Sequence, residues 1–233
     1  MTHTVDANLT SNWRERVVAR SVQRAASSPR DRRSRDSIAR RALRPTTKMV
    51  HVAVELAQER GLDSFTVQDV LKRADVSIQT FYRHFDSKDE LLLAVLEEAV
   101  TAQAAEYRRR ISQLRDPVAR VEYVVKAPFL GRIDRRLSPL IVREHLHLME
   151  RYAREVRAAD ESYRELLREA IVDAQDAGHF KNVGAADEAE LIMALVLTRY
   201  HNLLLRVVTR SASSEAEHLW EFCRAALTRG EDG

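Results

Sequence analysis

Apolar residues recur at helical spacing along most of the chain from Thr46 onward. The first stripe predicts a helix that ends at Gly61, because glycine readily takes the left-handed conformation of a helix stop. Farther along, similar stripes predict helices at about 116–132, 138–157, 160–178, 186–209 and 214–228. No segment alternates apolar and polar residues over a sustained length, so we expect no strands. The pattern predicts an all-α fold.

Three helix-start signals follow one another closely between residues 66 and 90. Each is a hydroxyl residue that can cap a helix, and two have an acid three residues later: Thr66 with Asp69, Ser77, and Ser87 with Glu90. They predict two short helices joined by a turn at 75–77, and then a long helix. Phe81 and Phe85, four residues apart, are expected to face the core. A short helix pair between longer helices is typical of a helix-turn-helix.

If Phe81 and Phe85 are buried, the rest of the second short helix faces outward. We expect this face to present Ile78, Gln79, Thr80, Arg83 and His84. A glutamine can pair bidentately with adenine, and the methyl groups of Ile and Thr can touch thymine methyls in the major groove. The free N–H groups at capped helix starts suit phosphate. Taken alone, a capped helix pair is more often core scaffolding than a DNA-binding element, so both interpretations stay open at this point.

The strings DVLKRADVS at 69–77 and TFYRHFDSKDEL at 80–91 resemble the DNA-binding domain of TetR (tetracycline-repressor-like) regulators, over residues 46–98. The resemblance implies phosphate contacts from Tyr82, His84 and Lys88, a contact from Thr66, and base contacts from Ile78, Gln79 and Thr80. Further candidate DNA contacts are Thr47, Lys48, Ser77, Arg83, Arg40, Arg41 and Arg44. Two positions depart from the family pattern. Asp75 and Gln79 stand where such proteins commonly carry glycine, so Asp75 is expected to be left-handed and the operator sequence is left open.

The rest of the chain resembles the family in architecture alone, which implies a domain that binds a small effector and forms a homodimer. The helices at 186–209 and 214–228 would form the dimer interface, with Leu191, Leu195, Leu205, Leu219, Phe222 and Ala226 in a four-helix bundle. The candidate effector pocket contains Tyr123, Phe129, Glu144, His145, Met149, Arg199, His201 and Asn202. Tyr123, Phe129 and Met149 could equally be core. The polar group at 199–202 could instead form hydrogen bonds across the interface.

Charge is distributed unevenly along the 233 residues. Net charge is +3, but residues 14–44 hold eleven arginines against three acids, whereas residues 45–90 carry a net −2. Residues 1–44 are therefore interpreted as a basic, flexible extension, followed by the DNA-binding domain at 45–92 and the effector-binding and dimerisation domain at 93–233. The extension is either a solvated tail or an arm that contacts phosphates or the minor groove. In the second case, deletion of residues 1–44 weakens binding and flattens its salt dependence.

Several function classes are not supported by the sequence. A single cysteine, Cys223, makes no internal disulfide, and no signal-peptide core or membrane-length apolar run is found, which favours a cytoplasmic protein without a membrane partner. His145 and His147 lie two apart on a helix and point in different directions, so we expect no shared metal. The sequence contains no nucleophile–base set, phosphate-binding glycine loop or metal cluster, so we expect no cofactor and no enzyme activity. The resemblance to TetR regulators implies a repressor that a small hydrophobic effector releases from a palindromic operator. The alternative is a non-specific architectural DNA-binding protein that relies on its basic arm.

Overall fold

The computed structural model describes residues 12–26, 35–61, 65–131, 138–182 and 184–228, and every regular element in these ranges is an α-helix. The all-α prediction is confirmed. The helices form two compact units: unit 1 comprises Met1–Ala99 and Arg143–Ala159, and unit 2 comprises Val100–Val142 and Asp160–Gly233. Among the described residues, no helix is both long enough and apolar enough to cross a membrane.

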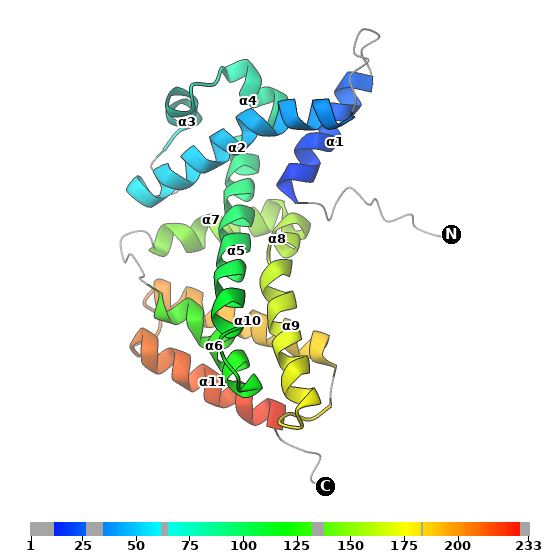
Figure 1. Cartoon of the computed structure of the whole chain (residues 1–233). Helices are drawn as coiled ribbons and strands as arrows, with labels where there is room; N and C mark the ends of the chain where they lie inside the picture. Colours follow the sequence, from blue (N-terminus) through cyan, green and yellow to red (C-terminus); the bar gives the residue numbers. More distant parts are fainter. Residues whose placement is uncertain (1–11, 27–34, 62–64, 132–137, 183, 229–233) are drawn as a thin grey trace, which may run out of the picture. The chain divides into compact units, whose positions relative to one another are not determined.

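Unit 1 is built around the helix-turn-helix (Figure 1). Its helices are α1 (Trp13–Ala26), α2 (Arg35–Arg60), α3 (Val67–Ala74), α4 (Ile78–His84), the first part of α5 (Lys88–Ile111), the end of α7 (Ser138–Arg151) and α8 (Ala153–Ala159). Each contributes apolar side chains to one buried cluster, which includes Met49, Leu71, Phe81 and Leu91. The cluster holds the two short helices in place, since helices of seven or eight residues have little stability of their own.

The start of α2 differs from the sequence prediction. Residues 35–44 were expected to belong to an extension with little to bury, but they form the first ten residues of α2, and the helix continues through Pro45. Ala42 and Thr46 are buried, and the Thr46 hydroxyl donates to the carbonyl oxygen of Ala42 at 2.7 Å. The prediction failed because α1 packs on α2 and supplies contacts that local composition does not reveal.

The turn between α3 and α4 has the expected conformation. Asp75 is left-handed, at φ 51° and ψ 53°, and ends α3 in place of the more common glycine. Thr66 forms the predicted capping box, because its hydroxyl accepts from the Asp69 N–H and the Asp69 carboxylate accepts from the Thr66 N–H. Gly61, at φ 96°, follows the end of α2 as predicted.

Unit 2 contains the remaining part of α5, with α6 (Pro117–Leu130), the start of α7, α9 (Glu161–Asp176), α10 (Ala185–Leu204) and α11 (Ala212–Thr228). Helix α6 packs on both α9 and α11, and α10 packs on α9 (Figure 1). Their buried faces form a second cluster around Val124, Leu166, Ile171 and Trp220. Asp116 caps α6 and Pro117 occupies its first turn, as the sequence predicted.

Two helix boundaries in the second half differ from the sequence prediction. Helix α10 ends at Leu204 and not near 209, because Arg206 is left-handed at φ 57° and the Val207 N–H donates to the Asn202 carbonyl at 2.9 Å. This is a Schellman-type stop at a residue that rarely makes one. The helix predicted at 138–157 is divided at Tyr152 into α7 and α8, although backbone hydrogen bonds continue across it.

Candidate DNA-binding surface

Helix α4 presents one buried face and one exposed face, as the sequence predicted. Phe81 and Phe85 are buried, and their rings pack with centroids 5.7 Å apart. On the other face Tyr82 is 56% exposed, and Ile78, Gln79 and Arg83 are also exposed. The Ser77 hydroxyl caps the helix by accepting from the Thr80 N–H at 3.2 Å. The geometry therefore leaves side chains of the right chemistry for base contact on the open side of a rigidly held helix.

Four further candidate contacts lie in unit 1, two at helix starts and two within α2. Thr66 is exposed, with its hydroxyl 2.7 Å from the Asp69 carboxylate. Lys88 is half-buried, and its ammonium group lies 4.9 Å from the centre of the buried Phe65 ring. This cation–π contact limits the positions that the ammonium can take. On α2, Lys48 is exposed and Thr47 is half-buried.

An open groove of about 970 Å³ lies between α1, α2 and α4. It brings together two groups of predicted residues that are far apart in the sequence: Arg41 of α2, and Gln79, Thr80, Tyr82 and Arg83 of α4. Arg24 of α1 lines it as well. Arg40 and Arg44 are exposed on α2 but do not line the groove. The groove thus places cations from two other helices, α1 and α2, beside α4.

The structure corrects the prediction for His84. Its side chain is only 5% exposed and does not face outward with Arg83. Burial, together with the nearby Arg83, Arg24 and Arg20, lowers the pKa of the His84 imidazole from its ordinary 6.5 to about 4. At neutral pH the imidazole is therefore uncharged, so any contact with phosphate would be a hydrogen bond without ionic attraction.

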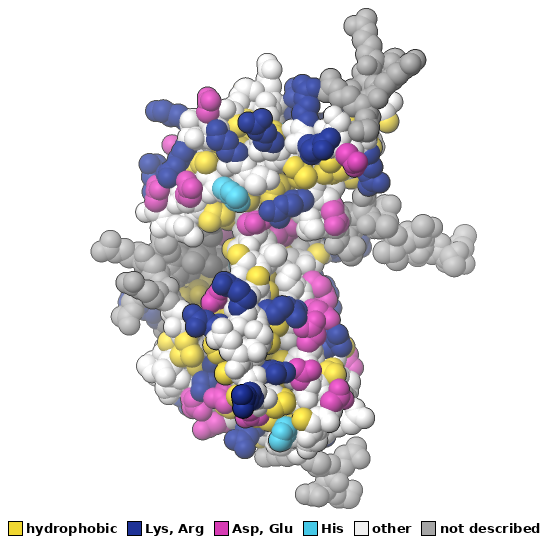
Figure 2. Space-filling model, viewed as in Figure 1, with side chains coloured by type: hydrophobic (Ala, Val, Ile, Leu, Met, Phe, Trp, Pro, Cys, Tyr) yellow, Lys and Arg dark blue, Asp and Glu magenta, His cyan; other side chains and the backbone are white. Residues whose placement is uncertain are grey.

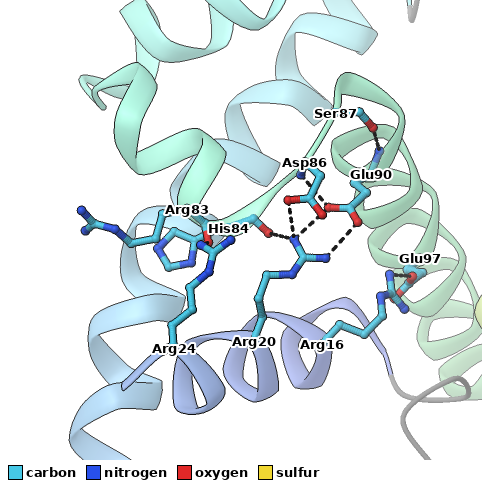
Figure 3. Close-up of polar contacts among 9 residues, drawn as sticks. All are labelled: Arg16, Arg20, Arg24, Arg83, His84, Asp86, Ser87, Glu90 and Glu97. Carbon is cyan, nitrogen blue, oxygen red and sulfur yellow. Dashed lines mark hydrogen bonds and ion pairs between the residues drawn. The ribbon is translucent and has the colours of Figure 1, made fainter. Parts of the chain in front are cut away.

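Arginines of α1 bind to other helices of unit 1, and the sequence-based prediction missed these contacts. Arg16, Arg20 and Arg24, here called the arginine row, point from α1 toward the end of α4 and the start of α5 (Figure 3). Their spacing of four residues places them on one helix face, and this was the available signal. Removal of residues 1–44 would also delete α1 and the first ten residues of α2, so that deletion does not isolate an arm.

Charges of both signs are mixed over unit 1. In the face drawn in Figure 2, Lys and Arg side chains lie among Asp and Glu side chains and do not form one continuous basic area. Exposed Arg73, for example, pairs with Glu59 at 2.7 Å and Glu55 at 3.1 Å. On the face drawn, the charge pattern therefore consists of individual cations beside acids, and attraction to a polyanion there would depend on particular cations.

The residues predicted for an effector pocket are divided between the two units. Tyr123, Phe129, Arg199, His201 and Asn202 belong to unit 2, whereas Glu144, His145 and Met149 belong to unit 1. Phe129 is buried in the core of unit 2, with its ring edge-on to Tyr200 at 5.9 Å. Arg199 forms an ion pair with the buried Glu215 of α11. For Phe129 and Arg199, packing within unit 2 thus accounts for the side chain.

The helices predicted to form a dimer interface expose large apolar side chains. Leu191 is 61% exposed and Phe222 is 60% exposed, and Leu205 and Ala226 are also exposed. Leu195 is half-buried, and Leu219 is buried in the core of its own unit. Apolar side chains exposed in this number on two neighbouring helices are typical of a surface that binds another protein.

Residues 50–95 match the model of the family described as bacterial regulatory proteins, tetR family. The chain is 30% identical over 95 residues to the HTH-type transcriptional regulator YvdT of Bacillus subtilis, covering 41% of this chain and 48% of YvdT. It is 29% identical over 83 residues to the HTH-type transcriptional repressor KstR2 of Rhodococcus jostii, covering 36% of this chain and 41% of KstR2. The aligned residues thus span less than half the length of each curated relative.

The fold resembles that of the Thermus thermophilus FadR, a TetR family transcriptional repressor solved in complex with lauroyl-CoA. The TM-score is 0.64 at 20% identity, and the match covers 81% of this chain and 98% of FadR. At this identity the likeness is one of fold.

Proposed function

We propose that this chain, whose helix-turn-helix in unit 1 matches the tetR family of bacterial regulatory proteins at residues 50–95, is a sequence-specific DNA-binding transcriptional regulator with α4 as its recognition helix. The observation that carries the proposal is the exposed face of α4, which presents Ile78, Gln79, Tyr82 and Arg83 while Phe81 is buried. The protein binds ligands and DNA in this proposal and catalyses no reaction.

In this proposal, one group of residues contacts the bases and another group contacts the phosphates. Ile78, Gln79 and Thr80, at the start of α4, touch base edges in the major groove. Phosphates are contacted by Thr47, Lys48, Thr66, Ser77, Tyr82, Arg83 and Lys88, and by Arg40, Arg41 and Arg44 of α2. Residues 45–90 carry a net −2, so the arginines of α2 supply cationic attraction that the remainder of the helix-turn-helix lacks.

We infer a homodimer formed by α10 and α11, which accounts for the exposure of Leu191 and Phe222. Two copies would place their recognition helices one turn of DNA apart, roughly 34–36 Å, in successive major grooves of a palindromic operator. Replacement of Phe222 by Asp is expected to yield a monomer in sedimentation, with Glu221→Asp as the matched exposed control on α11.

We further propose that unit 2 binds a small hydrophobic effector and that binding releases the operator. The lauroyl-CoA bound by the Thermus thermophilus FadR, whose fold this chain resembles, supports an effector with an apolar chain. Release requires that the effector prefer a dimer conformation whose recognition helices no longer fit one DNA turn. Of the pocket candidates from the sequence, Tyr123, His201 and Asn202 lie in unit 2 and are not accounted for by the packing described above, so these three are proposed to contact the effector.

The test is a selection of random DNA duplexes on the purified protein, repeated with two variants. Wild type is expected to recover an inverted repeat. Gln79→Ala should change the preferred base at one position of each half-site, whereas Gln113→Ala, an exposed glutamine of unit 2, should change nothing. If duplexes bind but no motif emerges, the protein is the non-specific architectural binder and the regulator proposal fails.

A further inference from the structure

Helix α1 lies before the family match at 50–95, yet it is packed into the helix-turn-helix unit. Trp13 and Val17 are buried in the core of unit 1. Helix α1 packs along α2 and also contacts α4. A helix that contacts the recognition helix can influence where that helix points.

The central contact is Arg20, which joins two helix ends at once (Figure 3). Its Nη1 donates to the carbonyl oxygen of His84, the last residue of α4, at 2.7 Å, and to Glu90 Oε2 at 3.0 Å. Its Nη2 donates to Glu90 Oε1 at 2.9 Å. The last carbonyls of a helix have no partner within it and carry partial negative charge, so a guanidinium there stabilises the helix end.

Glu90 extends the same network into α5. Its carboxylate accepts from the Asp86 N–H at 2.8 Å, and its own N–H donates to the Ser87 hydroxyl at 3.2 Å. Asp86 also lies 3.6 Å from Arg20. The end of α4, the 85–87 connection and the first turn of α5 are therefore tied to one guanidinium group.

The other two arginines of the row add contacts from α1 to both α4 and α5. Arg24 donates to the carbonyl oxygen of Arg83, the residue before His84. Arg16 pairs with Glu97, which is buried and also accepts from the Trp13 N–H at 2.5 Å. Helix α1 is thus fixed to α5 at its start and to α4 at its end.

We propose that α1 is a positioning element for the recognition helix and that Arg20 is its specificity-determining residue. The inference rests on the proposed DNA-binding function. Because the Arg20 guanidinium is ion-paired with Glu90 and hydrogen-bonded to the His84 carbonyl, it orients α4 and contacts no phosphate. Loss of Arg20 therefore lowers affinity for the operator without changing the number of counterions released.

The experiment measures affinity of wild type and four variants for the duplex selected by wild type and for a scrambled duplex, at several salt concentrations. Arg20→Gln is expected to lower operator affinity by about tenfold, as the loss of charged hydrogen bonds predicts, with scrambled-duplex affinity and the salt slope unchanged. Arg20→Lys retains the charge without the forked geometry and should recover part of the affinity. Glu90→Gln, which keeps an oxygen for the Asp86 N–H, should reproduce the effect from the other side of the ion pair.

Arg41→Gln is the matched control from the groove wall. It is expected to weaken both duplexes alike and to reduce the salt slope by about 0.9 for each phosphate that the variant no longer neutralises. Hydrogen exchange of the amides at 81–85, followed without DNA, gives a second measurement and should be faster in Arg20→Gln than in wild type.

The possible results separate the positioning role from the DNA-binding function. If Arg20→Gln keeps the wild-type ratio of operator to scrambled affinity, the positioning role is overturned and the DNA-binding function stands. If it weakens both duplexes and flattens the salt dependence, Arg20 contacts phosphate directly and the inference is wrong. If wild type selects no motif, the proposed function fails, and with it any role of Arg20 in specificity.

Discussion

Buried His84 should make unit 1 lose stability on mild acidification. With a pKa of about 4 in the folded protein and 6.5 in the unfolded chain, the imidazole binds a proton in the unfolded state first. The contribution of the neutral imidazole to the free energy of unfolding is therefore fully present above pH 6.5 and is lost as the pH falls toward 4. The two pKa values give a loss of about 2 kcal/mol in the free energy of unfolding between pH 7 and pH 5.

The assay follows urea unfolding of unit 1 by fluorescence at pH 7, 6 and 5. The chain has two tryptophans, and Trp13 lies in unit 1 whereas Trp220 lies in unit 2, so a Trp220→Phe background makes Trp13 the reporter. In that background, between pH 7 and pH 5, the free energy of unfolding should fall by about 2 kcal/mol more in the protein with His84 than in the His84→Gln variant. Other titrating groups cancel in the comparison.

The matched control is His51→Gln, since His51 is an exposed histidine on α2 of the same unit. Its replacement is expected to leave the extra pH dependence in place. If the protein with His84 and the His84→Gln variant lost equal free energy of unfolding on acidification, the reasoning would be refuted. That result would mean that His84 has the same pKa in the folded and the unfolded state.

Three other changes probe the helix ends and the core of unit 2. Asp75→Gly should raise the free energy of unfolding by about 0.5 kcal/mol, since glycine relieves the left-handed strain at some cost in chain entropy, and Asp75→Ala should not, as urea midpoints would reveal. Thr66→Ala should lower the free energy of unfolding by about 1 kcal/mol, because the α3 cap is lost, whereas Thr66→Ser should retain most of the stability that the cap provides. Equal thermal midpoints for the two variants would argue against a capping role. Arg199→Met should destabilise unit 2 by about 3 kcal/mol, because it leaves the buried Glu215 carboxylate without its main partner. The double variant with Glu215→Leu should recover much of that stability, and an additive double variant would show that the two side chains act independently.

The sequence determined the features of unit 1 that depend on a few neighbouring residues. The Thr66 and Ser77 caps, the buried Phe81 and the left-handed Asp75 were all predictable, because a cap, a short periodic stripe or a turn involves residues within about one helical turn. The family resemblance rested on the same short strings, which is why it identified the helix-turn-helix and its recognition helix but no effector.

Only the tertiary structure decided the features that join distant segments. Arg20 meets Glu90 across seventy positions of sequence, and burial together with Arg24 and Arg20 of α1 contributes to the lowered pKa of His84. The stop at Arg206 likewise lacks the glycine that would have marked it. Local pattern gives the face of a helix but not which helix will cover it, and the free energy of that choice comes from packing and ion pairs between elements far apart in the chain.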